Sequence, residues 1–227
     1  NSAASLIVDA PVFPTPGGFY EDSVEVTLSA AEGLSIRYTL DGSEPTADSM
    51  LYTEPLILTD PSSSPNVWSA REDITSEDRN YQVPGEPVDK AVIVRAAAFD
   101  ENGHRSNTVT STYFVDFSEK EGYDGAVMLS LVTDPDSLFS SEEGIYVRGS
   151  LYDEALENGQ IYSELPWIEL MDYTQYYLEG LSSERSAHIE LYSAYGDILL
   201  DQECGIRIRG NESRSFPQKS FTLYSRK

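Results

Sequence analysis

Alternating apolar and polar residues dominate the first half of the chain and predict short β-strands there. Residues 23–30 read SVEVTLSA, which places Val24, Val26 and Leu28 on one face of a strand. The same two-residue period recurs at residues 34–40, 91–99 and 108–115. Turn sequences rich in Gly, Pro, Asn and Asp separate these segments. Short strands with turns between them and no helical period predict a small β-sandwich.

Residues 60–87 interrupt this pattern with Ser, Pro and charged side chains. The segment is too long for an ordinary turn between two strands. We therefore expect it to be an exposed insertion.

The pattern changes around residues 117–125, where charged residues and glycines replace the alternation. Beyond this point, residues 150–180 lack a clean period and predict a partly helical excursion. A short helical turn is predicted over residues 134–139, with Asp134 or Asp136 able to cap it. Strands are predicted at residues 127–132, 144–149, 187–193, 204–209 and 220–225. The sequence thus predicts a mostly β chain with one domain at residues 1–117 and another at residues 118–227.

Three motifs in the first half carry a resemblance to a known family. They are PTPGGFY at residues 14–20, IRYTLDGSEPT at residues 36–46 and SMLYTEPL at residues 49–56. Together they resemble the chitobiase/β-hexosaminidase C-terminal type of immunoglobulin-like domain, over roughly residues 10–117. The resemblance implies an Ig-like β-sandwich that accompanies enzymes and surface proteins and has no catalytic role. Asp41, in the Asp-Gly turn, is then expected to form a turn.

The second half ends on a long motif, GIRIRGNESRSFPQKSF at residues 205–221. With MLSL at residues 128–131 and GIYVRG at residues 144–149, it resembles the start of the CotH kinase family, named for a spore coat protein. The resemblance covers about residues 126–227 and implies a truncated α+β kinase-like segment. Family members are secreted or spore-surface proteins that use ATP and a divalent metal such as Mg²⁺ to phosphorylate Ser or Thr of a protein substrate.

Basic residues gather in this motif although the chain as a whole is acidic. Residues 207–227 contain six Lys and Arg against one Glu. Alternation predicts a strand with Ile206 and Ile208 facing the core, and with Arg207 and Arg209 on the other face. Such a local reversal of charge suits a polyphosphate. Charges on a solvated edge strand, where they discourage aggregation, are the alternative explanation.

The resemblance assigns roles to individual residues of this segment. Lys219 would hold the nucleotide phosphates, with Arg209, Ser213 and Arg214 in support, as in the phosphate-covering loop and lysine of kinases. The family often has two lysines after the proline, and here Gln218 stands in place of the first. We expect Lys219 to be exposed.

The catalytic and metal-binding carboxylates of that family would follow Lys227. The abrupt end after the last predicted strand then makes this chain a fragment, which we expect to be inactive alone. Its parent is either an atypical protein kinase with an Ig-like accessory module or a noncatalytic surface protein. In the second case a cell-wall or plant polysaccharide would be the partner, and both place the protein outside a bacterial cell, on the cell or spore surface.

The charge of the chain excludes some partners. Fifteen Lys and Arg against 39 Asp and Glu give a net charge of −24, which repels nucleic acids and anionic membranes. No apolar run is long enough to insert into a membrane. The first residues, NSAASLIVDAP, contain no basic n-region, and we expect them to be the start of a mature or trimmed chain. Cys204 alone cannot form an intrachain disulfide and is expected in the core, and the isolated His104 and His188 predict no metal site.

Overall fold

The computed structural model describes residues 8–225, and the chain is mostly β with an Ig-like fold. Its contacts divide it into two compact units, each assembled from three segments. Unit 1 comprises Asn1–Ser63, Asp89–Val132 and His188–Gln202, and unit 2 comprises Ser64–Val88, Thr133–Ala187 and Glu203–Lys227. The boundary predicted between residues 117 and 118 falls inside the second segment of unit 1, and as a boundary between folding domains it stays a prediction.

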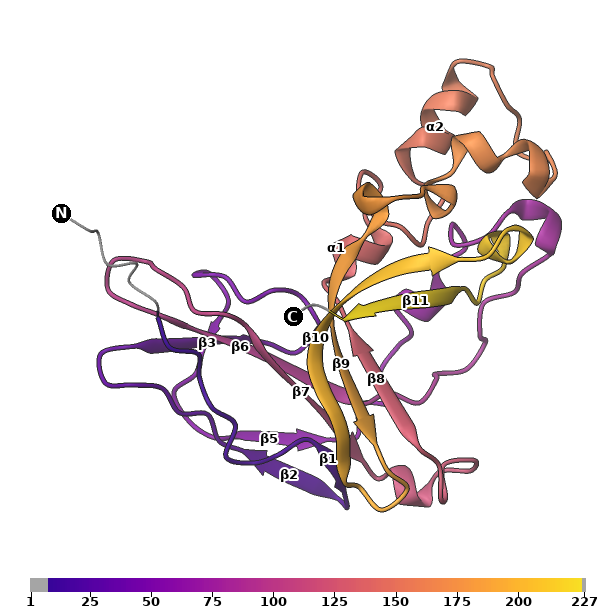
Figure 1. The fold of residues 1–227 in the computed structure, drawn as a ribbon. Helices are drawn as coiled ribbons and strands as arrows, with labels where there is room; N and C mark the ends of the chain where they lie inside the picture. The colour runs from indigo at the N-terminus through magenta and orange to yellow at the C-terminus, as the bar shows by residue number, and fades with distance from the viewer. Residues whose placement is uncertain (1–7, 226–227) are drawn as a thin grey trace. The chain divides into compact units, whose positions relative to one another are not determined.

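Two sheets of unit 1 account for the strands predicted in the first half (Figure 1). The larger has the strand order β1-β7-β6-β3-β4, and the smaller pairs β2 with β5 antiparallel. β1 runs parallel to β7, whereas β7, β6, β3 and β4 pair antiparallel. The bounds are β1 Gly18–Tyr20, β2 Ser23–Val26, β3 Ser35–Thr39, β4 Met50–Leu51, β5 Leu56–Thr59, β6 Val92–Phe99 and β7 Val109–Val115.

The alternating residues of these strands form the core of unit 1. Val24 and Val26 of β2 are buried while Ser23 and Glu25 between them are exposed, as the two-residue period predicted. They pack with Val94 of β6 and with further buried residues of β3, β5 and β7. The predicted strands over 23–30, 34–40, 91–99 and 108–115 are therefore confirmed, with trimmed ends.

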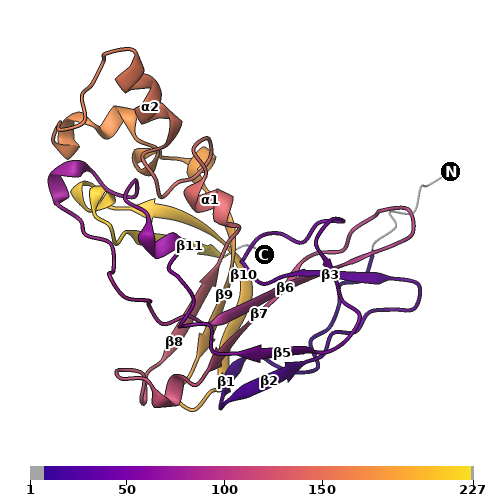
Figure 2. The same cartoon turned by 180° about the vertical axis from the view of Figure 1, so that it is seen from behind.

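A further sheet has the order β11-β10-β9-β8, so β7 and β8 belong to different sheets (Figure 2). Within unit 1, Tyr192 of β9 packs edge-on against Phe114 of β7, with 5.4 Å between ring centroids. Cys204 is buried, as expected for a core residue. The bounds are β8 Met128–Val132, β9 Arg185–Tyr192, β10 Ile198–Arg209 and β11 Ser220–Ser225.

Unit 2 contains the helices, α1 Pro135–Phe139 and α2 Gly149–Glu157. Of the two predicted capping residues, Asp134 takes the role: its Oδ1 accepts a hydrogen bond from the backbone N–H of Asp136 at 2.9 Å. The excursion after α2 consists of single 3₁₀ turns, which confirms its partly helical character. Their bounds are η4 Trp167–Glu169, η5 Met171–Tyr173, η6 Gln175–Tyr177 and η7 Leu181–Ser183.

The strand predicted at residues 144–149 is wrong. This segment forms turns, and its backbone N–H groups bond to the preceding segment, Ile145 to Ser137 and Tyr146 to Leu138. Gly149 has a φ of +70° and begins α2. Ile145 and Val147 are buried, so the alternation correctly marked core residues but not a strand.

The 60–87 segment carries two 3₁₀ turns, η1 Trp68–Ala70 and η2 Glu77–Arg79. The expectation that it is exposed throughout is wrong at its centre, where Ile74, Thr75 and Ser76 are buried. Thr75 donates a hydrogen bond to the backbone carbonyl of Ser215 at 2.6 Å, which anchors the segment within unit 2. None of the helices among residues 8–225 has the length and apolar character that a bilayer crossing requires.

Candidate phosphate-binding site

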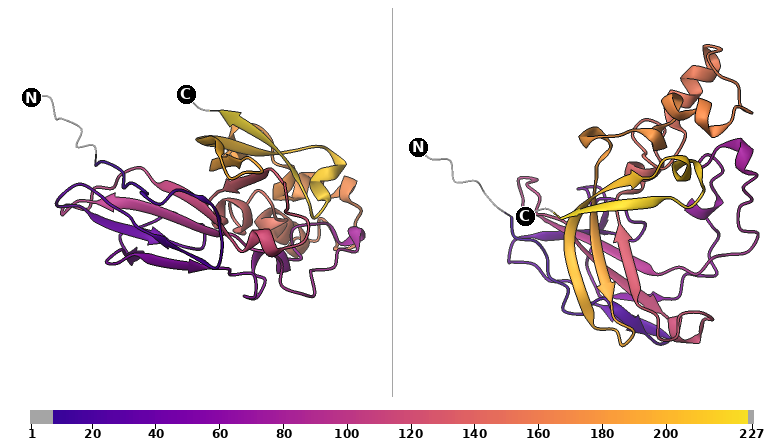
Figure 3. Two further views of the ribbon diagram at one scale, coloured as in Figure 1. Left: turned by 90° about the horizontal axis from the view of Figure 1, so that it is seen from below. Right: turned by 45° about the vertical axis from the view of Figure 1, so that its right-hand side comes forward.

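β10 and β11 form the antiparallel hairpin that holds the basic motif (Figure 3). Ile206 and Ile208 are buried in β10, and the opposite face carries Arg207 and Arg209, as predicted. Arg209 stands opposite Ser220 of β11 in the register. The hairpin therefore presents two arginines on one face, two residues apart along β10.

The turn between these strands depends on Gly210, which has a φ of +123°. A Cβ atom built there would lie 2.0 Å from Oγ of Ser213, so no larger residue fits without a shift. The 3₁₀ turn η8, Glu212–Ser215, follows. Arg214 closes the turn because its Nε donates to the carbonyl of Gly210 at 2.7 Å.

A pocket of about 270 Å³ lies beside the turn within unit 2. Arg207, Arg209 and Arg214 all line it, together with residues of the 178–183 segment and of β11. In a chain with a net charge of −24, this is a concentration of positive charge around one hollow. The pocket is therefore the anion-binding candidate of unit 2.

Two of the three arginines are held by acidic partners. Arg207 donates to Oε2 of Glu184 from Nε at 2.9 Å and from Nη2 at 2.7 Å. Arg214, itself buried, donates to Oε1 of Glu179 at 3.1 Å. Arg209 is exposed and has no ion pair among the residues that the structure describes. Arg209 is thus the guanidinium available to an incoming anion.

Lys219 lies elsewhere, in the interior of unit 2. Its Nζ donates to the backbone carbonyls of Ile74 at 2.5 Å and Phe216 at 2.7 Å, and lies 4.4 Å from the ring centroid of Tyr176. Only 9% of its surface is exposed, so the expectation of an exposed lysine is wrong. Burial lowers the pKa of Lys219 to about 7. The long stem of lysine let Nζ reach the carbonyl of Ile74, 145 residues away in the sequence, which no local pattern shows.

The predicted site residues are thus only partly brought together. Arg209 and Arg214 share the pocket, Ser213 packs against Gly210 in the adjoining turn, and Lys219 is absent from the lining. The assignment of these residues to phosphate stays a prediction. The acidic partners Glu179 and Glu184 escaped the sequence analysis because they lie more than 20 residues from the arginines they bind. Arg226 and Lys227, counted in the basic segment, lie outside the described residues.

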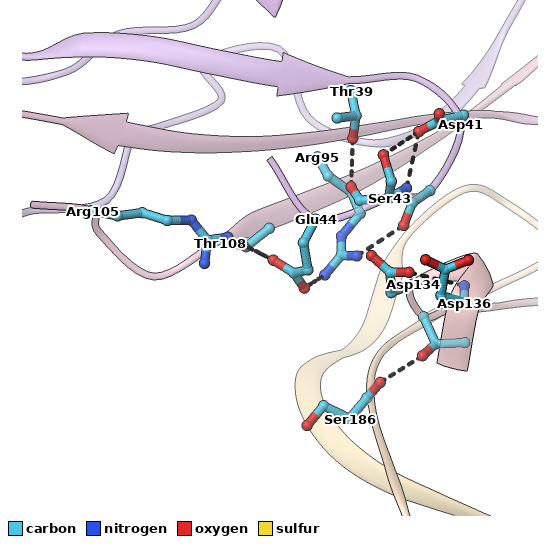
Figure 4. A network of polar contacts seen from close by, with 12 residues as sticks. Thr39, Asp41, Ser43, Glu44, Arg95, Arg105, Thr108, Asp134, Asp136 and Ser186 are labelled. Atoms are coloured by element: carbon cyan, nitrogen blue, oxygen red, sulfur yellow. Dashed lines mark hydrogen bonds and ion pairs between the residues drawn. The ribbon is translucent and has the colours of Figure 1, made fainter. Parts of the chain in front are cut away.

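The Asp-Gly motif of unit 1 is a structural turn, as expected (Figure 4). Oδ1 of Asp41 accepts from the backbone N–H of Ser43 at 3.0 Å and from its hydroxyl at 2.6 Å. Glu44 then binds Arg95, Arg105 and the hydroxyl of Thr108. Burial works to raise the pKa of Glu44, and the Thr108 hydrogen bond and the two arginines outweigh it, so the pKa is lowered. The carboxylates of Asp41 and Glu44 are therefore both occupied by hydrogen bonds and ion pairs that hold the turn.

Neither histidine joins a cluster of metal ligands. Nδ1 of His104 lies 2.7 Å from Oδ2 of Asp100, and Nε2 of His188 lies 3.1 Å from Oδ1 of Asp201. Over residues 8–225, no group of three or more His, Cys, Asp or Glu side chains is arranged to hold a metal ion.

Comparison with known families gives one match. The model of the Chitobiase/beta-hexosaminidase C-terminal domain family matches residues 15–66, which contain the turn motif and strands β1 to β5. No curated protein matches the chain. The carbohydrate-associated Ig-like family is therefore supported for part of unit 1.

Proposed function

We propose that residues 118–227 are the N-terminal part of a CotH-type kinase domain, and that the pocket beside β10 receives the phosphate groups of ATP. The observation that carries the proposal is the convergence of Arg207, Arg209 and Arg214 on one pocket of an acidic chain. Planar guanidinium groups suit phosphate oxygens because they can donate two parallel hydrogen bonds. The long basic motif that resembles this family supplies the same three arginines.

The residues of the pocket fit a phosphate in part. Arg209 would make the first contact, and Arg214 and the hydroxyl of Ser213 would follow from the turn. Lys219 would have to leave the carbonyls of Ile74 and Phe216 before Nζ could reach a phosphate. When bound, ATP supplies the phosphoryl group, and a divalent cation such as Mg²⁺ offsets the charge of its phosphates.

The proposal extends to the parent protein. Its substrate would be a Ser or Thr side chain of another protein, and it would act outside a bacterial cell, on the cell or spore surface. The Ig-like module would serve as a spacer or docking unit. The carboxylates that orient the acceptor hydroxyl and hold the metal would come from residues after Lys227.

A second candidate function follows from the family match at residues 15–66. A noncatalytic, carbohydrate-associated surface protein would use the Ig-like module beside a cell-wall or plant polysaccharide. The basic hairpin would then be a solvated strand without a ligand. Nucleotide binding separates the two candidates.

The test is calorimetric titration of the 227-residue chain with MgATP and with tripolyphosphate. We expect weak binding, because Arg207 and Arg214 already bind Glu184 and Glu179 and the contact from exposed Arg209 is screened by water. Arg209→Gln should weaken it about threefold to tenfold, since it removes one charge-assisted contact worth about 1 kcal/mol. Arg71→Gln is the matched control, because Arg71 is also in unit 2 but does not line the pocket. Absence of binding by either probe, or equal affinity of the Arg209→Gln variant, would contradict the proposal.

A further inference from the structure

Unit 2 has another pocket, remote in sequence from the basic motif and different in chemistry. Its volume is about 260 Å³, below the usual range of drug-sized sites and suited to one small ring. Six of its lining residues come from the 60–87 segment, and the seventh, Arg148, directly precedes α2. The six are Glu72, Thr75, Ser76, Glu77, Asn80 and Tyr81.

The wall of this pocket is held in place by contacts to the η8 turn. Arg79 donates to Oγ of Ser215 at 3.0 Å and to Oε1 of Glu212 at 2.9 Å. Thr75 donates to the carbonyl of Ser215. Asn80 adopts the left-handed conformation, with φ 49° and ψ 40°, where it ends η2. The pocket therefore has a fixed wall although it lies in a segment without strands.

Ser76 is the feature that points to a ligand. It is completely buried and lines the pocket, and its Oγ has no hydrogen-bond partner among the described residues. An unsatisfied buried hydroxyl costs about 1–3 kcal/mol. Because its Oγ has no accessible surface, the Ser76 side chain would turn toward the pocket on binding, and a ligand hydroxyl would then satisfy it by donating or accepting.

The charges of the pocket restrict the chemistry of that group. Arg148 lies 3.2 Å from Glu77, so these two charges largely offset each other. Glu72 adds a carboxylate, which disfavours anions, and the guanidinium disfavours metal cations. What remains is the offset Arg148–Glu77 pair, the neutral donors and acceptors of Ser76 and Asn80, and the carboxylate of Glu72 as an acceptor. This set suits a neutral ligand that carries hydroxyls.

Three further residues complete a surface suited to a polyol. The exposed side chains of Glu72 and Asn80 make no hydrogen bond to the described residues, so both remain available to adjacent hydroxyls. Tyr81, anchored by its hydroxyl to the carbonyl of Ser69 at 3.4 Å, adds a half-buried aromatic ring with an apolar face. A pyranose has both kinds of surface, hydroxyls at its edge and C–H groups on its face.

We propose that this pocket binds a single neutral pyranose unit, either a free sugar or one residue of a polysaccharide. Ser76, Asn80 and Glu72 would bond its hydroxyls, and Tyr81 would contact its face. The site is separate from the proposed phosphate pocket, with which it shares no lining residue.

Saturation-transfer NMR on the 227-residue chain tests the proposal. The probes are the methyl glycosides of glucose, mannose and galactose, and N-acetylglucosamine, each titrated into the millimolar range. We expect at least one to saturate, and we expect Glu72→Gln and Asn80→Ala each to weaken it about tenfold. Asp78→Asn is the matched control for charge and should bind normally, because Asp78 is exposed in the same turn and does not line the pocket.

Ser76→Ala separates a binding role from a folding role. Because its Oγ has no partner, its removal should leave the thermal midpoint unchanged or raise it, while sugar affinity falls. Saturation by none of the probes would overturn the proposal, as would equal affinity of the Glu72→Gln and Asn80→Ala variants. Binding of glycine or Ca²⁺ in place of every sugar would also overturn it. The Arg209→Gln variant should keep full sugar affinity, so the outcome is independent of the nucleotide proposal.

Discussion

At the scale of the residue, Lys219 shows how burial changes the role of a charged side chain. On a solvated strand its ammonium would be free to hold a phosphate. In this fold Nζ joins Ile74 and Phe216 and lies over the rings of Tyr176 and Tyr146. Its first role is therefore to cross-link the 60–87 segment to the η8–β11 connection within unit 2.

The pKa of Lys219 gives this role a measurable signature. Because burial lowers the pKa from 10.5 to about 7, the unfolded chain binds more protons than the folded chain between these two pH values. The free energy of unfolding should therefore rise with pH across this window, by a few kcal/mol from this group if the full shift applies.

Lys219→Met should remove that rise. Urea titrations of both proteins at several pH values between 6.5 and 9.5 measure it, and the quantity of interest is the difference between them. A difference that stays constant across the window would show that Lys219 keeps its ordinary pKa in the folded chain.

At the scale of the element, a buried polar cluster joins β7, β8 and β9 in unit 1. Glu190 of β9 is only 1% exposed, and it accepts hydrogen bonds from Thr112 at 2.5 Å and from Tyr192 at 2.7 Å. The hydroxyls of Thr112 and Ser130 are also 2.7 Å apart. Burial raises the pKa of Tyr192, with the nearby charge of Glu190 as a further cause, so its hydroxyl stays a donor. The strands are thus linked by hydroxyl groups around one buried carboxylate.

The Thr112→Val substitution tests how much this cluster contributes to the unfolding free energy of unit 1. The substitution keeps the shape and removes a donor to Glu190, so we expect unit 1 to lose about 2 kcal/mol of unfolding free energy. Thr110→Val is the matched control two residues earlier on the same strand, because Oγ1 of Thr110 is buried without a partner and its loss should cost nothing. Chemical denaturation followed by tyrosine fluorescence gives both values, and equal stabilities of the two variants would contradict the role of the cluster.

At the scale of the whole molecule, the net charge of −24 sets the response to polyanions and to salt. Like charges on the folded chain repel one another, and salt screens that repulsion over about 10 Å at 0.1 M. The arginines of the proposed phosphate pocket are a local exception to this field. We therefore expect the chain to repel a long polyanion, although a small phosphate could still bind at these arginines.

Two measurements check whether the net negative charge governs polyanion binding and the effect of salt on stability. The chain should pass through a heparin column unretained at low salt, and its thermal midpoint should rise when sodium chloride is added. Retention on heparin that Arg209→Gln abolishes would show that the local charge outweighs the field of the whole chain.

The sequence by itself determined the strand content and the local chemistry. Alternation located β2, β3, β6 and β7 of unit 1 and the β10–β11 hairpin, because the period of side-chain direction in a strand is a property of the backbone alone. The short strands β1, β4 and β5 were not predicted. The Asp41 turn was predictable because it is closed by atoms two residues apart, and for the same reason the cap before α1 was narrowed to Asp134 or Asp136. The grouping of arginines on one hairpin also followed from spacing.

Only the tertiary structure decided which of these residues meet. It buried Lys219 and the centre of the 60–87 segment, replaced the predicted strand at residues 144–149 by turns, and gave Arg207 and Arg214 their acidic partners. It also formed the pocket around Ser76, which no motif marks. These outcomes depend on contacts between segments far apart in the chain, where packing and the need to satisfy buried polar groups override local preference.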